Sequence, residues 1–288
     1  MRKILILGCT GMLGHVLMNE FSQKGSFEVF GTTRNTYANP DFHVYTSADA
    51  CDICGIENLL KSLKPDIVIN AIGIIKQLPE AADSIISIKI NSLFPHEVAA
   101  ICEKISVRLI HISTDCVFSG RKGNYNENDF ADADDLYGRS KYLGEVKYPN
   151  CVTLRTSIIG HELRGKFGLI EWFLGSENLI KGYTSAIYTG FPTIELAHII
   201  ADIVIPNQSL SGLYHVSSNP ISKFDLLTLV AHVYGKEIEI EPFDMIRDNK
   251  SLDSSLFRKV TGYTPPSWEI LIDNMHRAYI KNRNMYRP

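Results

Sequence analysis

The first 21 residues of the chain constrain its fold most. A short β-rich run at residues 3–7 leads into Gly8-Cys-Thr-Gly11-Met-Leu-Gly14, and helical periodicity then continues to about Phe21. Glycine suits such a strand-to-helix turn because a Cβ would block both the turn and the approach of a ligand to the backbone amides. Those amides and the positive end of the helix dipole favour phosphate, so this order predicts a dinucleotide-binding unit. The expected cofactor-binding residues of this loop are Gly8, Thr10, Gly11, Met12, Leu13 and Gly14.

Strand and helix signals alternate through the first half of the chain. The expected strands are residues 3–7, 27–32, 43–46, 67–71, 107–112 and 152–155, and the expected helices include residues 83–104 and 136–147. Such alternation favours parallel pairing through crossover helices. We therefore expect an α/β fold, with a doubly wound parallel Rossmann sheet in residues 1–155. Residues 156–288 should form a smaller C-terminal lobe, from which residues 186–217 return to the sheet.

Composition and charge exclude several classes of protein. Hydrophobic residues make up 45 % of the 288 residues and the net charge is −3, without a basic stripe, so we expect no nucleic-acid partner. No apolar run in the sequence approaches the roughly 18 residues of a membrane span. The apolar run 4–7 is shorter than the roughly 7–15 residues of a signal-peptide core, which predicts a cytoplasmic protein. Cys51 and Cys54 form a C-x-x-C without a second cysteine pair or a histidine cluster, so we expect reduced thiols and no metal.

The end of the second expected strand indicates which dinucleotide is bound. NAD-binding proteins usually carry an acidic residue there for the ribose 2′-hydroxyl, whereas a nearby arginine accommodates a 2′-phosphate. The sequence here is Gly31-Thr32-Thr33-Arg34, without an acid. We therefore expect NADPH, with Arg34 binding the phosphate through paired hydrogen bonds. A solvated Arg34 and the use of NADH are left open.

A hydroxyl and a Tyr-x-x-x-Lys pair follow further along the chain. Thr114 lies at the end of the strand expected at 107–112, and Tyr137 and Lys141 open the next helix on one face. An ammonium group beside a phenol favours phenolate and lowers its pKa. Tyr137 would then donate a proton to a carbonyl oxygen as hydride arrives, while Thr114 holds that oxygen. One Tyr-x-x-x-Lys is expected by chance in a chain of this composition. The prediction of a reductase therefore rests on the order of the glycine loop, the strand-end hydroxyl and the Tyr-x-x-x-Lys pair.

With these motifs the sequence resembles the extended short-chain dehydrogenase/reductases, and among them the dTDP-4-dehydrorhamnose reductase family with its capsule and O-antigen relatives. Matching stretches run through nearly the whole chain in the family's order. They are GCTGMLG, VINAIG (68–73), INSLFP (90–95), HISTDCVFSG (111–120), YGRSKYLGE (137–145), LRTSIIG (154–160), GFPT (190–193) and SLDSS (251–255).

The resemblance implies a nucleotide-sugar substrate, bound by the second lobe, whose 4-keto group is reduced in deoxysugar synthesis for surface polysaccharide. It implies that Thr114, Tyr137 and Lys141 are catalytic, with Lys141 also contacting the nicotinamide ribose. Further cofactor contacts would be Asp52, Ile53, Asn70, Ala71 and Gly73, and substrate contacts would be Lys76, Thr114, Arg155 and Thr193. A turn-forming Asn70, a solvated Lys76, and an Asn91 that either kinks its helix or faces solvent are left open. We assign Glu145 to helix packing or a surface pair.

Cys116 departs from the rhamnose-type pattern, which has Tyr at this position. GDP-fucose synthase uses a Cys there as an acid/base, so a bifunctional epimerase/reductase with Cys116, partnered by His161, is one alternative; a buried apolar role for Cys116 is the simpler one. The acidic stretch 126–135 should be a solvated loop. Two further alternatives are a non-catalytic NADP-binding regulatory subunit, like the family's methionine adenosyltransferase beta-subunit branch, and a reductase of another ketone. A homodimer is left open.

Overall fold

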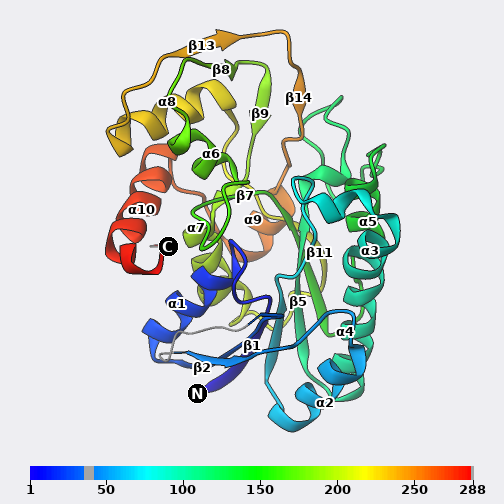
Figure 1. Ribbon diagram of the computed structural model, residues 1–288. Coiled ribbons are helices and arrows are strands. Elements are labelled where there is room, and N and C mark those ends of the chain that lie inside the picture. The colour runs from blue at the N-terminus through cyan, green and yellow to red at the C-terminus, as the bar shows by residue number, and fades with distance from the viewer. Residues whose placement is uncertain (36–41, 287–288) are drawn as a thin grey trace.

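A parallel sheet between two layers of helices forms the centre of the computed structural model, which describes residues 1–35 and 42–286 (Figure 1). All its neighbouring strands pair in parallel, and its order is β11-β6-β5-β4-β1-β2-β3. The strands are β1 Arg2–Leu7, β2 Phe27–Thr32, β3 His43–Tyr45, β4 Ile67–Asn70, β5 Arg108–Thr114, β6 Cys151–Thr156 and β11 Gly212–His215. The expected doubly wound α/β architecture is confirmed.

Alternate residues of the strands enter two separate cores. On β1, Ile4 and Ile6 belong to one core, and Leu5 and Leu7 to the other. The first core lies beneath α1 Gly14–Lys24, α7 Thr193–Ile199 and α10 Trp268–Lys281, and the second beneath α2 Ile53–Leu63 and α4 Phe94–Lys104 (Figure 1). Burial on both faces explains why these strands read as continuous apolar runs.

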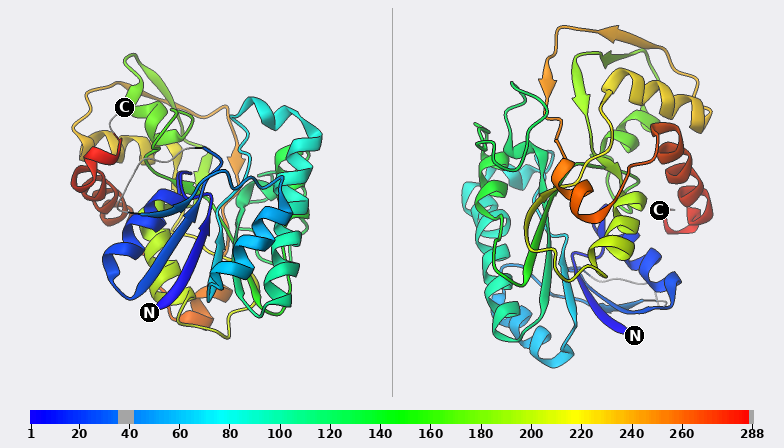
Figure 2. Two further views of the ribbon diagram at one scale, coloured as in Figure 1. Left: turned by 60° about the horizontal axis from the view of Figure 1, so that its bottom comes forward. Right: turned by 180° about the vertical axis from the view of Figure 1, so that it is seen from behind.

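A smaller lobe lies beyond the carboxyl ends of the strands, where the functional residues gather (Figure 2). It consists of short sheets and helices. These are β7 Ile158–Ile159 with β10 Phe191–Pro192; β8 Ile180–Tyr183 with β13 Ile240–Phe243; β9 Ala186–Tyr188 with β12 Ile221–Ser222 and β14 Asp248–Asn249; and α6 Leu169–Gly175, α8 Lys223–Tyr234 and α9 Ser255–Thr261. Between β9 and β12, the chain returns to the main sheet as β11.

The helix expected at residues 83–104 is interrupted by a wider turn. It comprises α3 Ser84–Ile88, the π-helical turn η2 Lys89–Leu93 and α4. Asn91 lies in this turn, 1 % exposed, and its side chain bonds both the amide and the carbonyl of Ile74 and the hydroxyl of Ser140. Asn91 therefore lies where the helix is distorted, and its side chain does not face solvent. The continuous helical stretch Ser84–Lys104 is long and apolar enough to span a membrane, but 56 % of its apolar window is buried in the protein, as in a core helix.

The helix that carries Tyr137 is shorter than its sequence pattern predicts. This helix, α5, spans Leu136–Leu143 and ends at Gly144 rather than near residue 147. A Cβ on Gly144 would collide with the carbonyl oxygen of Asn91, so α5 ends where it packs closely against η2. Its first turn is capped by the Asp135 carboxylate, which accepts from the amide of Gly138 at 2.6 Å.

Candidate active site

The glycine loop folds tightly between β1 and α1. Gly8 has φ +82°, and a Cβ there would lie 2.9 Å from Cγ1 of Ile72. A Cβ on Gly14 would collide with the carbonyl oxygen of Gly8. These contacts leave room for glycine alone, and Gly11 is exposed at the tip of the loop. The arrangement fits a dinucleotide, whose pyrophosphate would approach backbone atoms and the N-terminus of α1.

The other expected cofactor residues divide into two groups. Arg34 is exposed just beyond β2, and Asp52 is exposed at the N-terminus of α2, where its carboxylate accepts from the amide of Gly55. Asn70 is fully buried instead: its amide nitrogen bonds Nδ1 of His111 at 3.2 Å and its oxygen accepts from the amide of Ile72 at 3.1 Å. The Asn70 side chain therefore forms the turn after β4, as the alternative interpretation expected, and a contact of Asn70 with the cofactor stays a prediction.

One short loop joins the glycine loop to the catalytic residues. Residues 71–73 follow β4, and Ile72 packs against Gly8 at one end. At the other end, a Cβ on Gly73 would lie 3.7 Å from Nζ of Lys141. Lys141 itself is 5 % exposed and donates to the carbonyl oxygen of Ile112 at 2.9 Å. The predicted phosphate-binding and catalytic residues are therefore connected through direct packing.

Thr114 and Tyr137 meet at the carboxyl end of β5. The Thr114 hydroxyl interacts with the phenol, but burial has the larger effect and raises the pKa of Tyr137 above its usual value. Burial also lowers the pKa of Lys141 to about 8, which the nearby Glu145 carboxylate opposes. The expectation that Lys141 lowers the pKa of Tyr137 is wrong for this structure, in which Lys141 bonds the Ile112 carbonyl. The phenol is held as a protonated donor.

Cys116 lies beside these groups in a single turn, η3 Asp115–Val117. Its amide donates to the Thr114 hydroxyl at 3.1 Å. Burial, reinforced by the charge of Asp115, raises the pKa of the Cys116 thiol to about 12, so the thiol does not ionise readily. The suggested partner His161 is engaged elsewhere, with Nδ1 at 2.7 Å from Glu171 and Nε2 at 2.9 Å from the Tyr234 hydroxyl. The expected Cys116–His161 pair is therefore wrong.

Two lysines approach the site from outside. Lys76 pairs with the carboxylate of Asp135 and lies 5.7 Å from the centroid of the Tyr137 ring. Lys250 follows β14, pairs with Asp248, and partly offsets the effect of burial on the pKa of Asp115, which burial raises. Lys250 was not predicted from the sequence, because more than a hundred residues separate it from Asp115 and no local pattern marks it.

Arg155 and Thr193 are not available where substrate contacts were expected. Arg155 is 2 % exposed and forms an ion pair with Glu145, with Nη2 at 2.6 Å from Oε2. Its predicted contact with substrate is therefore wrong for this structure, because the guanidinium is buried and directed at Glu145 and His215. Glu145, which we expected in helix packing or a surface pair, forms a buried ion pair. Thr193 is buried at the start of α7 and packs against Gly160. A Cβ on Gly160 would lie only 2.5 Å from Oγ1 of Thr193.

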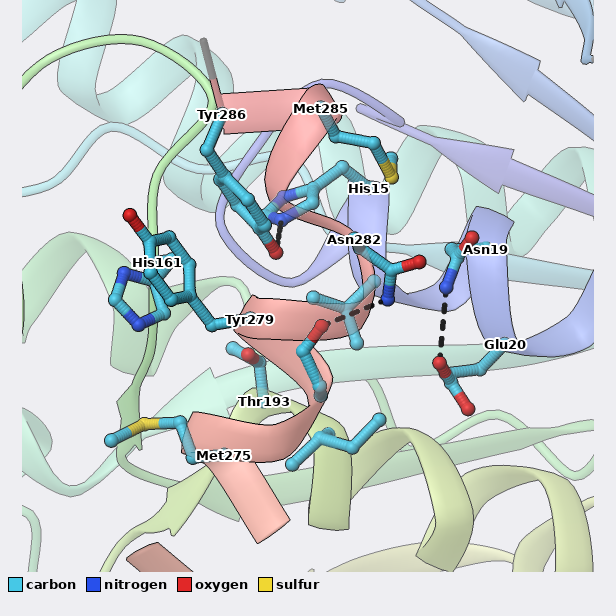
Figure 3. Close-up of a pocket in the computed structure, with 13 residues that line it drawn as sticks. His15, Asn19, Glu20, His161, Thr193, Met275, Tyr279, Asn282, Met285 and Tyr286 are labelled. Carbon is cyan, nitrogen blue, oxygen red and sulfur yellow. Dashed lines mark hydrogen bonds between the residues drawn. The ribbon is translucent and has the colours of Figure 1, made fainter. Parts of the chain in front are cut away.

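Thr193 lines a small cavity on the far side of α1 (Figure 3). The cavity measures about 20 Å³, which is room for roughly one water molecule. His15, the second residue of α1, bonds the Gly11 carbonyl through Nδ1 and the Tyr286 hydroxyl through Nε2, at 2.9 and 3.0 Å. The C-terminal turn η5 Arg283–Tyr286 is thereby fixed to the helix of the glycine loop. In residues 1–35 and 42–286, no three His, Cys, Asp or Glu side chains converge as a metal site.

Comparison with known proteins identifies the family. The model of the RmlD substrate binding domain family matches residues 1–279. The chain belongs to this family. It is 24 % identical over 306 residues to the dTDP-4-dehydrorhamnose reductase of Aggregatibacter actinomycetemcomitans, covering 97 % of this chain and 99 % of that protein. It is also 26 % identical over 254 residues to methionine adenosyltransferase 2 subunit beta of Danio rerio, covering 81 % and 74 %.

Solved structures agree with this assignment. A hypothetical dTDP-4-dehydrorhamnose reductase from Sulfolobus tokodaii superposes with a TM-score of 0.78 at 26 % identity, covering 93 % of this chain and 98 % of that one. The dTDP-4-dehydrorhamnose reductase of Bacillus anthracis, in complex with NADP, gives a TM-score of 0.79 at 21 % identity, covering 96 % and 100 %. The resemblance to dTDP-4-dehydrorhamnose reductases within the extended short-chain dehydrogenase/reductases is confirmed.

Proposed function

We propose that this RmlD-family protein is an NADPH-dependent reductase of the 4-keto group of a nucleoside-diphosphate 4-keto-6-deoxy sugar, acting in deoxysugar synthesis for surface polysaccharide. The observation that carries the proposal is the loop 71–73, which packs against Gly8 at one end and approaches Lys141 at the other. A dinucleotide on the glycine loop would therefore extend towards the Thr114, Tyr137 and Lys141 side chains. Bound NADPH would supply the hydride.

The protein's own groups supply the proton. Because burial raises the pKa of Tyr137, its phenol carries a proton at neutral pH and donates it to the carbonyl oxygen of the substrate. The Thr114 hydroxyl interacts with the same phenol and donates to Oδ1 of Asp115 at 3.2 Å; with substrate bound, it would turn to donate a second hydrogen bond to the carbonyl oxygen. The buried ammonium of Lys141 stabilises the negative charge left on Tyr137 after donation.

Arg34 is the proposed contact for the 2′-phosphate, and Lys76 for the nucleotide-sugar. Arg34 is exposed beyond β2, where its guanidinium would bind a phosphate by paired hydrogen bonds. Lys76 is exposed next to Tyr137, where the ion pair with Asp135 would open for an anionic ligand. Each contact is a prediction from position and charge.

The test is single-turnover oxidation of NADPH by the purified protein with dTDP-4-dehydrorhamnose and, separately, with GDP- and CDP-linked 4-keto-6-deoxy sugars. We expect one equivalent of NADPH to be oxidised and the 4-hydroxy sugar to appear. Epimerised product that disappears in the Cys116→Ser variant would support the bifunctional alternative, although the pKa of about 12 for this thiol argues against it.

A second candidate function is a non-catalytic NADP-binding subunit. The similarity to methionine adenosyltransferase 2 subunit beta of Danio rerio favours it. A regulatory subunit does not need a protonated phenol beside a buried ammonium, so the Tyr137–Lys141 arrangement favours catalysis. The absence of turnover with every 4-keto sugar, together with tight binding to a methionine adenosyltransferase catalytic subunit, would favour the regulatory function.

A further inference from the structure

Glu145 holds a buried polar network directly behind the catalytic residues. One carboxylate oxygen accepts from the Ser113 hydroxyl at 2.7 Å and from Nε of Arg155 at 2.8 Å, and the other accepts from Nη2 of Arg155 at 2.6 Å. The side chains of Glu145 and Arg155 are both 2 % exposed. This geometry gives the carboxylate a full set of charge-assisted bonds, as a buried charge requires.

Three neighbouring strands carry, in one row, the two partners of Glu145 and the histidine that bonds one of them. Ser113 on β5 is directly opposite Arg155 on β6, and Arg155 is opposite His215 on β11. His215 is fully buried, and burial together with Arg155 lowers its pKa to about 3, so its ring is neutral. It therefore accepts from Nη1 of Arg155 at 2.9 Å through Nε2, and donates from Nδ1 to the Tyr125 carbonyl at 2.9 Å.

This row connects the two elements that carry the catalytic groups. Ser113 immediately precedes Thr114 on β5, and Glu145 lies four residues after Lys141, just beyond the C-terminus of α5. Bonds from Glu145 to Ser113 therefore fix the end of α5 against the end of β5. The carboxylate is also the negative charge that acts on the Lys141 ammonium.

We propose that Glu145 is a positioning residue of the proposed reductase: held by Ser113, Arg155 and His215, it keeps Lys141 charged and keeps α5 in register with Thr114. The expected effect of Glu145 on the reaction rate rests on the proposed function, whereas its expected effect on the charge of Lys141 does not. Other titratable groups near Lys141 are Tyr137, four residues earlier on its own helix, and His111 on β5, on which the Lys141 charge acts. Burial lowers the pKa of His111 far below its usual value, so His111 adds no charge near neutral pH.

The direct test is the titration of Lys141 by NMR in protein labelled with ¹³C at the lysine ε-carbon, with the resonance assigned by the Lys141→Met variant. We expect wild type to titrate near pH 8, and Glu145→Gln to titrate about one pH unit lower. Glu145→Asp keeps the negative charge, so Lys141 should titrate close to its wild-type pH in this variant. Glu195→Gln is the matched control, because Glu195 is also buried but accepts from the Tyr263 hydroxyl, away from Lys141.

Loss of the carboxylate leaves the Arg155 charge unpaired, which destabilises a fold strongly. The double variant Glu145→Gln/Arg155→Met removes both charges and provides the second measurement. An unchanged Lys141 titration in the variants that fold would overturn the proposal. If wild type reduces a 4-keto sugar, the alkaline limb of its pH–rate profile should move to lower pH in Glu145→Gln and stay fixed in Glu195→Gln. If wild type reduces none, the proposed function fails while the NMR titration still decides this inference.

Discussion

Lowering the pH should destabilise the fold through three histidines that are buried without charge, His15, His111 and His215; burial lowers the pKa of His111 far below its usual value. His15 is 1 % exposed and His215 is fully buried. Burial lowers the pKa of His15 to about 4 and that of His215 to about 3, from 6.5. Because the unfolded chain binds more protons than the folded one below pH 6.5, stability decreases as the pH falls through this value. The decrease continues to about pH 4 for His15 and about pH 3 for His215.

The size of the effect follows from proton linkage. Between about pH 8 and about pH 5, His15 and His215 should each cost about 2 kcal/mol, hence about 4 kcal/mol together, and His111 adds to this; the loss is a large share of the roughly 5–15 kcal/mol that stabilises a typical domain. The assay is urea unfolding over this pH range for wild type, His15→Gln, and His232→Gln, an exposed control. His15→Gln should lose about 2 kcal/mol less than wild type on acidification, whereas His232→Gln should behave as wild type. Equal losses in wild type and His15→Gln would refute the reasoning.

Three further substitutions test the cofactor and acid/base assignments. Arg34→Ala should raise KM for NADPH by roughly 10- to 100-fold, the value of a charge-assisted contact, and leave KM for NADH unchanged; equal changes for both cofactors would contradict the 2′-phosphate assignment. Gly14→Ala should abolish NADPH binding measured by calorimetry, because its Cβ collides with the Gly8 carbonyl; unchanged binding would contradict the role of the loop. Cys116→Ser should leave the reduction rate within about threefold of wild type, since a protonated thiol contributes little acid/base catalysis; a loss of orders of magnitude would show that Cys116 takes part.

Local sequence patterns predicted the parts of the fold that depend on neighbouring residues. The glycine loop and the buried strands follow from spacing and from continuous apolar runs. The helix at residues 53–63 was missed, although Asp52 caps it, because Cys54 and Gly55 in its first turn obscure the helical pattern. The end of α5 depends on a contact between Gly144 and Asn91, which are far apart in sequence.

In the candidate site too, contacts between residues far apart in sequence were not predicted from local patterns. The Thr114, Tyr137 and Lys141 set was predictable because each lies at a strand end or on one helical face. The burial of Arg155 was not, since its partners Glu145 and His215 come together only when β6 lies between β5 and β11. Burial also decides the protonation of Tyr137 and Cys116, and a single sequence does not give the depth of a side chain.

The central claim is that Tyr137 donates the proton in carbonyl reduction, and one measurement tests it most directly. Single-turnover NADPH oxidation with dTDP-4-dehydrorhamnose is compared for wild type, Tyr137→Phe and Tyr142→Phe, the last an exposed tyrosine on the same helix. NADPH binding, measured by calorimetry, should be the same in all three. We predict that Tyr137→Phe lowers the single-turnover rate by about 10²- to 10⁴-fold, while Tyr142→Phe matches wild type. A Tyr137→Phe variant that reduces the sugar at the wild-type rate would contradict the account.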